Sequence, residues 1–576
     1  MSTRARTWVG VAALAAAFVL PAAASAHAAL LQTTPVASRI VSTPPTQVSL
    51  RFSEAVEPRF AIVSVTDANG QQKTAGAPHR SPSNPNTLVV PLERLSQGWY
   101  LVYWRVISVD GHPVRGAFTF AVGPNPGPAP QFVVPSTSET AATPKLVTAR
   151  WVAFLAFMAA IGLFVLRMVV ARPLVARVSG TRLRSISIAF AVACAIALVA
   201  IPVYFLLATA EFALRSFWSF GALFPLVRAS AFGRGWLDLE IVFALFVLAA
   251  AIAIWLDRPE RRERSVAGLL ALAGALAAAA ATLVVPGVAG HAGETSPRGL
   301  SLTFDWFHLV AGSVWVGGLI GLIVLAASLP AARRVAGLVV CVPRFSNTAL
   351  VSVLVLIGSG IGSALQHIPT LASLWQTSYG KALLVKIALL AVALLLASVN
   401  LLRTTPRFKA SNRRPELGPP AASLLRRLVS GEVVLITGAV LGAAVLSSLA
   451  PPSKALASVG HATARVGPGK VEEVVNKNGY RLVFRVAPNR AAVPNSFELE
   501  LTKNGKPVRH ADVTTSFDML DMTMGEQTYR LSETQPGVYS RSAPALVMVG
   551  HWGLGYRITP PGQPSFDVLL VDKANG

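Results

Sequence analysis

Long apolar runs dominate the middle of the chain. Each is close to the ~20 residues that an α-helix needs to cross a bilayer, so each predicts a membrane span. We place spans at about 147–170, 185–209, 236–256, 266–287, 304–328, 345–366, 381–402 and 428–449. Small residues are dense in several of them, which suits close packing between helices. The pattern therefore predicts an eight-helix transmembrane bundle at residues 147–450.

The regions on either side of these runs have a different pattern. Short β-rich runs separated by Pro, Gly and Asn cover residues 46–53, 59–66, 87–92, 99–107 and 114–122. Beyond residue 451 the alternation of apolar and polar residues returns, with Asn504-Gly505 as a hairpin turn. We expect an all-β barrel or sandwich at 27–124, a linker at 125–146 and a β-sandwich at 451–576.

Composition and charge agree with a membrane protein. Hydrophobic residues make up 53% and charged residues 14% of the chain, which is too apolar for an ordinary soluble protein. Residues 1–26 combine a basic start, a short apolar core and the cleavage site Ala24-Ser25-Ala26, so they predict a secretory signal peptide. Residue 27 onward then lies outside the cytoplasm.

The loops that this topology places inside the cell carry most of the neighbouring arginines, as the positive-inside rule expects. We predict a multi-pass protein of the cytoplasmic (inner) membrane, with both β domains outside the cytoplasm. The net charge of +24 then reflects topology and contact with the anionic lipid bilayer. Because no basic patch alternates with stacking aromatics, we expect no nucleic-acid partner.

Two other classes of chemistry lack support. The two cysteines, Cys194 and Cys341, fall on different elements, so we expect no structural disulfide. Neither a Walker motif nor a Cys-x-x-Cys or Cys-Pro-Cys motif is present, which argues against ATP-driven metal transport by this chain.

Signal cleavage after Ala26 would make His27 the first residue of the mature protein. Its α-amine and imidazole could then chelate one metal ion, and nitrogen and oxygen donors in a tetragonal arrangement favour Cu(II). The alternative is that His27 is merely where the signal peptide ends. Asp110 and His112 are two residues apart, so in an extended backbone they face the same way and could complete the coordination. Asp110-Gly111 also commonly forms a simple turn.

Residues 27–122 resemble the periplasmic copper-binding domain CopC. The shared residues are His27-Ala-x-Leu, Thr34-Pro-Val, Val48-Ser-Leu-Arg-Phe-Ser-Glu54, Gly98-x-Tyr100, Trp104-Arg-Val106, Ser108-x-Asp110-Gly-His112 and Gly116-x-Phe118-x-Phe120. The resemblance implies a small β-barrel or sandwich in which His27, Asp110 and His112 hold Cu(II). Some relatives carry a Met-rich Cu(I) loop in this domain. This chain has no Met between residues 2 and 157, so we expect none here.

Ionisable residues in or beside membrane spans are candidates for function. His291 lies in the outer loop after the fourth span, and Asp305 and His308 share one face near the outer end of the fifth. We expect these three residues to form a copper entrance, with His367 on the same side of the membrane. The alternative is interfacial histidines at helix ends. Glu432, in the eighth span, is either functional or a partner for Arg426 or Arg427.

Residues 145–450 resemble the CopD inner-membrane family, which is associated with copper uptake. The shared residues are Asp305-x-x-His308, Trp315-x-Gly-Gly318, Thr377-Ser-Tyr-Gly-Lys381 with Lys386, and Arg426-Arg427 with Glu432. An internal repeat is also visible, because Ser230-Ala-Phe-Gly-Arg234 precedes the third span as residues 377–381 precede the seventh. Either four helices are duplicated in parallel or the similarity is chance.

Four of the seven methionines lie in the C-terminal region: Met519, Met522, Met524 and Met548. His551 follows shortly after the last of them. Thioether sulfur selects Cu(I), and polar residues surround the first three, so we expect a Cu(I) site on a surface loop. Filling of the core is the alternative. Residues 537–539 and 548–552 resemble YtkA-like domains, which are β-sandwiches found fused to CopD proteins.

Three functional classes follow. The first, which we favour, is copper binding outside the membrane and copper transport, with import as the direction, for copper homeostasis or resistance; extracytoplasmic copper chaperones are the expected protein partners. The second is a membrane-anchored copper-sequestering or delivery protein without transport. The third is a histidine-brace copper oxidase or monooxygenase. An acidic ligand such as Asp110 argues for tight Cu(II) binding and against oxygen chemistry, so we expect no enzyme.

Overall fold

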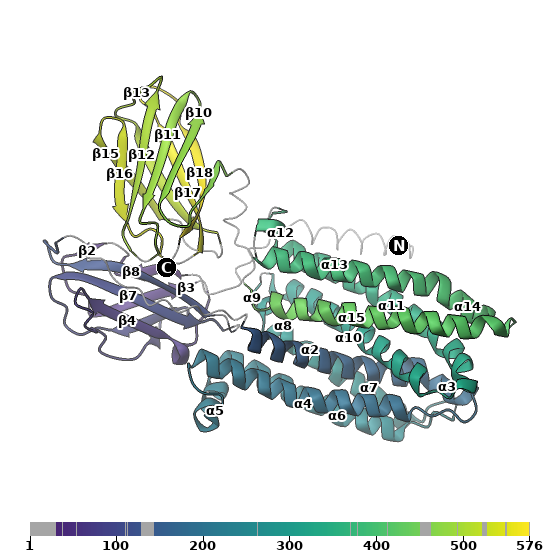
Figure 1. The fold of residues 1–576 in the computed structure, drawn as a ribbon. Coiled ribbons are helices and arrows are strands. Elements are labelled where there is room, and N and C mark those ends of the chain that lie inside the picture. Colours follow the sequence, from purple (N-terminus) through teal and green to yellow (C-terminus); the bar gives the residue numbers. More distant parts are fainter. Residues whose placement is uncertain are drawn as a thin grey trace, which may run out of the picture.

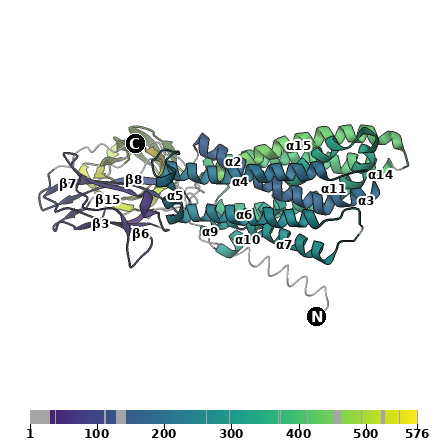
Figure 2. The same cartoon turned by 90° about the horizontal axis from the view of Figure 1, so that it is seen from below.

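The computed structural model has three parts: two β domains and a long helical bundle, with both β domains at one end of the bundle (Figures 1 and 2). It describes residues 30–574 except 37–38, 53, 110, 112, 128–142, 262, 296, 369, 372, 377, 412, 450–461, 492, 521–526 and 548–549. This arrangement confirms the predicted fold class. The predicted signal peptide lies outside the described residues, and the predicted domain boundaries stay predictions.

The N-terminal domain consists of two four-stranded sheets. One has the order β1-β3-β6-β5 and the other β2-β8-β7-β4. The strands are β1 Leu30–Thr34, β2 Ile40–Val41, β3 Gln47–Phe52, β4 Ile62–Asp67, β5 His79–Arg80, β6 Thr87–Pro91, β7 Gly98–Ile107 and β8 Pro113–Val122. Their inner faces share a core in which the Phe52 and Trp104 rings lie 5.4 Å apart, so the two sheets form a sandwich.

The C-terminal domain is a ten-stranded sheet in the described part of the chain, and it folds over itself. Its strands are β9 Ala464–Val466, β10 Val471–Lys477, β11 Tyr480–Ala487, β12 Asn495–Lys503, β13 Lys506–Pro507, β14 Asp512–Met519, β15 Gln527–Gln535, β16 Val538–Ala543, β17 Gly550–Thr559 and β18 Phe566–Ala574. Contacts between Phe484 and Tyr556 and between Phe497 and Phe517 join its two halves around one core.

Eight helices in the described part of the chain are long and apolar enough to cross a membrane. They run over Pro144–Arg177 (α2 Pro144–Val165, a π-helical turn and α3 Arg172–Arg177), α4 Arg184–Phe212, α6 Ala231–Leu256, Val266–Val288 (α7 Val266–Thr282 and α8 Val285–Val288), α10 Arg298–Ser328, α11 Ala331–His367, Ser378–Ala410 (α13 Ser378–Val399, a π-helical turn and α14 Thr405–Ala410) and Pro415–Leu446 (a 3-10 turn and α15 Gly418–Leu446). All eight predicted spans are confirmed. Short helices α5 Phe220–Ala229, α9 His291–Glu294 and α12 Ser373–Gln376 lie at the end of the bundle nearest the β domains.

The bundle is built from two similar sets of four helices. In each set the first helix packs on the second and the third on the fourth: α2 on α4 and α6 on α7, then α10 on α11 and α13 on α15. Gly233 and Gly380 make the same contact, since a Cβ on either would lie within 2.6 Å of the backbone of the residue six positions earlier. These shared contacts support duplication in parallel as the explanation of the repeat.

The two sets meet where α2 crosses α10. A Cβ on Gly317 would lie 2.5 Å from the Cα of Gly162, so only glycine permits this approach of the two backbones. Within the Trp-x-Gly-Gly pattern that begins at Trp315, the crossing explains Gly317, and close packing on the Phe345 ring of α11 explains Gly318.

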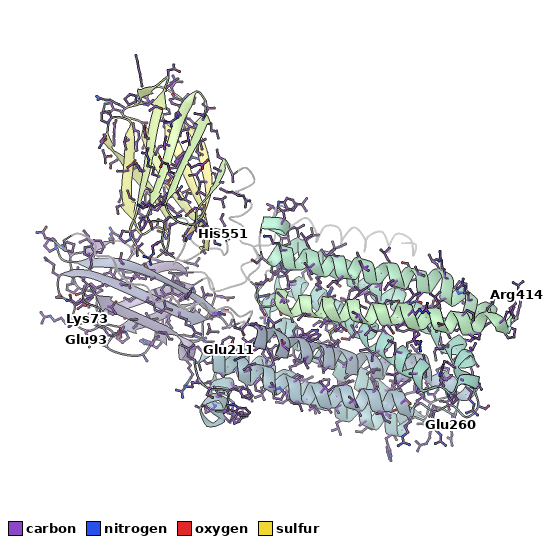
Figure 3. The ribbon with its side chains drawn as sticks, in the orientation of Figure 1. Lys73, Glu93, Glu211, Glu260, Arg414 and His551 are labelled. Atoms are coloured by element: carbon purple, nitrogen blue, oxygen red, sulfur yellow. The ribbon has the colours of Figure 1, made fainter. Side chains whose placement is uncertain are left out.

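The N-terminal domain is docked on the bundle. Arg105 donates a 3.0 Å hydrogen bond from Nη1 to the carbonyl of Phe212, at the end of α4, and the backbone N–H of Ala231 donates to a Glu57 carboxylate oxygen. The C-terminal domain contacts the N-terminal one, because the Ala117 N–H donates to the Val547 carbonyl at 3.1 Å. Arg414 and Glu260 mark the opposite end of the bundle, where the arginine-rich loops lie (Figure 3).

Candidate functional site

Two of the predicted entrance residues lie on α10, within three turns of its start. His308 faces α11, where its Nδ1 lies 3.3 Å from the Ser359 hydroxyl. The next residue is Gly360, and a Cβ there would come within 3.3 Å of the imidazole Cε1. A glycine on α11 thus makes room for this histidine.

Asp305 lies one turn before His308 and faces a different neighbour. Gly287 of α8 packs against it so closely that a Cβ there would be 2.7 Å from the carboxylate Oδ2. Asp305 interacts electrostatically with His291 of α9 and with Lys386 of α13, and Lys386 also interacts with His308. The structure therefore places Asp305 near His291, with Lys386 beside both Asp305 and His308.

His367 lies at the same end of the bundle as His291, Asp305, His308 and Lys386. We call these five residues the outer group, because the sequence predicts that this end of the bundle faces away from the cytoplasm. The His367 Nδ1 donates a 2.7 Å hydrogen bond to the Ser363 carbonyl, and its Nε2 lies 3.2 Å from the hydroxyl of Thr295, just after α9. It also interacts electrostatically with His291. The outer group thus joins α9, α10, α11 and α13.

The outer group is not a closed metal cage. Within the described residues, no three or more His, Cys, Asp or Glu side chains are placed so that they could hold a metal ion together. Lys386 interacts electrostatically with Asp305, so an amine already neighbours this carboxyl group. Lys386 was not predicted as a site residue, although a single lysine inside an apolar span is a signal of function. The outer group offers few metal ligands, and the Lys386 amine competes with a metal ion for the Asp305 carboxyl group. Such a group is better suited to brief contact with a cation than to holding it tightly.

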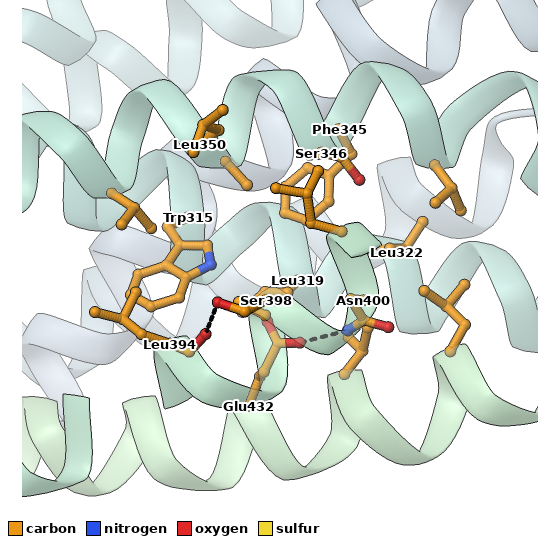
Figure 4. Close-up of a pocket in the computed structure, with 17 residues that line it drawn as sticks. Trp315, Leu319, Leu322, Phe345, Ser346, Leu350, Leu394, Ser398, Asn400 and Glu432 are labelled. Carbon is orange, nitrogen blue, oxygen red and sulfur yellow. Dashed lines mark hydrogen bonds between the residues drawn. The ribbon is translucent and has the colours of Figure 1, made fainter. Parts of the chain in front are cut away.

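A second polar feature lies deeper in the bundle, around a cavity of about 100 Å³ (Figure 4). Glu432 of α15 is 2% exposed and accepts a hydrogen bond from the Nδ2 of Asn400. Arg426 and Arg427, the partners considered from sequence, are exposed instead. Asn400 was not predicted as a site residue; its only signal in the sequence is a polar side chain at the end of an apolar span.

The predicted Cu(II) ligands His27, Asp110 and His112 lie outside the described residues. Gly111 is described, and its φ of +88° shows a turn between β7 and β8, not the extended backbone expected from the spacing. Its N–H donates to the Ser108 carbonyl at 2.9 Å. A Cβ on Gly111 would lie 2.5 Å from the ring of Phe232, so this turn rests on the start of α6.

Of the predicted Cu(I) ligands, only Met519 and His551 are described. Met519 is 2% exposed and lies in the core of the C-terminal domain, opposite Trp552, as the core-filling alternative expects for this residue. His551 is exposed on β17, at the end of the domain nearest the other two parts (Figure 3). Met522, Met524 and Met548 lie outside the described residues, and their role stays a prediction.

Comparison with known proteins gives matches in all three parts. The model of the CopC domain matches residues 30–123, that of copper resistance protein D matches 339–446, and that of YtkA-like proteins matches 475–556. Copper resistance protein C of Xanthomonas campestris pv. juglandis is 35% identical over 115 residues, which cover 19% of this chain and 90% of that protein. The chain belongs to the CopC–CopD family.

The CopC–CopD arrangement extends over nearly the whole length of a curated relative. Copper transport protein CutJ of Bacillus subtilis (strain 168) is 26% identical over 538 residues, 92% of this chain and 93% of that protein. The crystal structure of CopC from Methylosinus trichosporium OB3b is 32% identical and covers 18% of this chain and all of that one, with a TM-score of 0.17. The CopC domain is thus followed by a multi-pass CopD membrane domain and a YtkA-like domain.

Proposed function

We propose that this CopC–CopD fusion binds copper outside the cytoplasmic membrane and imports it, in the service of copper homeostasis or resistance. Relatives named for copper transport and copper resistance support this proposal, and none of those reported above is named as an enzyme. In the proposal, His27, Asp110 and His112 hold Cu(II), and the chain has no catalytic role. Extracytoplasmic copper chaperones are the proposed donors.

One observation carries the proposal: close contacts lead from the turn at Gly111 between β7 and β8, here called the CopC turn, to the outer group. Gly111 rests on Phe232 of α6. One turn along α6, a Cβ on Gly235 would lie 2.7 Å from the Cβ of Ala289, just after α8. Gly287 of α8 in turn packs against Asp305. The CopC turn therefore lies within a few side chains of the membrane residues that we propose as the copper entrance, His291, Asp305 and His308.

The direction and the remaining sites follow the charge pattern and the ligand types. Arg414, in an arginine-rich loop, lies at the end of the bundle away from the β domains, so we place that end in the cytoplasm (Figure 3). We assign the Cu(I) site of the C-terminal domain to His551, Met522, Met524 and Met548, with sulfur as the soft donor.

Copper accumulation in vesicles that hold the purified full-length protein tests the proposal. Asp305→Asn removes the carboxylate at unchanged size, and we expect uptake to fall about tenfold, which corresponds to about 1.4 kcal/mol. Asp238→Asn is the matched control, because Asp238 is also the eighth residue of an inward-running helix but is exposed. Vesicles that bind copper only on their surface, with none inside, would favour the sequestering alternative.

A further inference from the structure

Glu432 is a buried carboxyl group beside a cavity between the helices that is open on the side of Leu350. The cavity of about 100 Å³ is large enough for a few water molecules. Trp315 of α10, Phe345 of α11, and Ser398 and Asn400 of the seventh span line it together with Glu432, and the remaining lining is aliphatic except for Ser346 (Figure 4). The cavity thus places one acidic group among apolar side chains inside the membrane bundle.

No cation compensates Glu432 in the described part of the chain. The helices packed against α15 contribute no lysine, arginine or histidine to the cavity lining. On the lining elements, Arg344 of α11 is half-buried, and three arginines are exposed: Arg403 on the π-helical turn, and Arg426 and Arg427 on α15. Helix α2 also packs against α15, but its buried Arg150 donates to Tyr204 and to Ser447 and Ser448 after the end of α15. A carboxylate here would be a buried charge without a counter-charge, which is costly in a membrane interior.

Glu432 and Asn400 together have more hydrogen-bond acceptors than donors. Asn400 supplies Nδ2 to one carboxylate oxygen, while its own Oδ1 is buried with no hydrogen-bond partner among the described residues. Three acceptor oxygens therefore share one donor group. A proton on Glu432 would remove the charge and supply a second donor at the same time.

The cavity and the outer group both lie where the helices of the second set, α10, α11, α13 and α15, pack together. We call this region of contact the seam. Asp305 and His308 lie on α10 above Trp315, and Lys386 lies on α13 above Leu394, which lines the cavity. Lys386 and Asn400 are 14 positions apart on one helix, so about 21 Å separates the two groups along the seam. A cation that enters at the outer group would meet the cavity next on its way inward.

We propose that Glu432 binds a proton and that copper crosses this seam in exchange for it. This inference rests on the proposed transport function. While the cavity holds no cation, the proton stays on the carboxyl group. When a copper cation occupies the seam, its positive charge compensates the carboxylate, and the proton leaves through the cavity water to the side from which the copper came. After the copper leaves toward the cytoplasm, Glu432 takes up a new proton from that side, so one proton moves outward for each copper ion that moves inward.

Vesicles with a trapped pH indicator test the exchange. Full-length protein is reconstituted, and copper is added outside as Cu(II) or, without oxygen, as Cu(I). We expect the lumen to become more alkaline as copper enters, in either orientation of the protein. In Glu432→Gln, which keeps the size of the side chain, we expect protons moved per copper to fall at least tenfold. Glu240→Gln is the matched control, since Glu240 is a half-buried carboxyl group on α6 of the other set.

The outcomes separate this inference from the proposed function. If the wild type imports copper but Glu432→Gln moves as many protons per copper, the exchange is wrong and transport stands. Acidification of the lumen that depends on Glu432 would also overturn it. If the wild type imports no copper, transport fails, and infrared difference spectra decide the proton site alone. Those spectra should show a protonated carboxyl band that copper removes and that Glu432→Gln lacks; its presence in the variant refutes the assignment.

Discussion

Asp572 should make the stability of the C-terminal domain fall as pH rises through the acid range. Its side chain is fully buried on β18. Oδ1 accepts a 2.8 Å hydrogen bond from Asn489, whereas Oδ2 has no hydrogen-bond partner among the described residues. Burial raises the pKa of Asp572 from 3.8 to about 6, against the opposing effect of the Asn489 hydrogen bond. The folded domain therefore keeps a proton that the unfolded chain releases.

The sign and size of the effect follow from proton linkage. Between about pH 4 and pH 6 the folded state binds more protons than the unfolded state, so the free energy of unfolding decreases as pH rises. A pKa difference of about two units corresponds to about 3 kcal/mol, and this loss is complete near pH 7. Asp572→Asn cannot ionise, so it should escape this loss. It leaves an amide N–H₂ where Oδ2 lay, which costs about 1–3 kcal/mol at every pH.

Urea unfolding of residues 462–576 at several pH values measures the effect. Trp552 is a tryptophan with 1% exposure and is the sole tryptophan in that segment, so its fluorescence reports the unfolding of the core. We expect the stability of Asp572→Asn relative to the wild type to improve by about 2.4 kcal/mol from pH 4 to pH 7. The comparison cancels most other titrating groups, which both proteins share.

Asp567→Asn, on the same strand, is the control with the opposite sign. The hydrogen bond from Arg557 lowers the pKa of Asp567, so this carboxylate adds stability that is lost as pH falls. The stability of Asp567→Asn relative to the wild type should therefore decrease as pH rises. If the difference between Asp572→Asn and the wild type does not change with pH, the buried acid is not protonated at pH 5 and the reasoning is wrong.

Three further predictions concern the copper sites and the bundle. One extra Gly ahead of His27 should weaken Cu(II) binding to residues 27–125 strongly, because it separates the amine from the imidazole; equal affinity in titrations would exclude the chelate. Replacing Met522 and Met524 with Leu should weaken Cu(I) binding in the C-terminal domain, and unchanged affinity with an intact fold would exclude them as Cu(I) ligands. Gly317→Val should lower the stability of the bundle by about 1–3 kcal/mol or more, seen as a lower melting temperature in detergent. Gly358→Val, where a Cβ meets nothing within 4 Å, should not.

The three-part architecture could be predicted because its signals are local. A run of apolar residues long enough for a bilayer and an alternation of apolar and polar residues are properties of short segments. The eight apolar helices, the main strands of the N-terminal domain and the turn at Asn504-Gly505 lie where these patterns placed them. Helix α11 begins at Ala331, well before the predicted start at residue 345, because residues 331–344 carry arginines and do not form an apolar run.

The sequence by itself determined the span count, the β domains and the residue types of the candidate copper sites. Only the tertiary structure decided which of these residues meet. Lys386 joins Asp305 and His308, Asn400 pairs with Glu432, and the turn at Gly111 rests on α6, although each set comes from distant parts of the chain. Such meetings depend on which helix faces pack together, and glycines on neighbouring helices set that packing through contacts that no local pattern reveals.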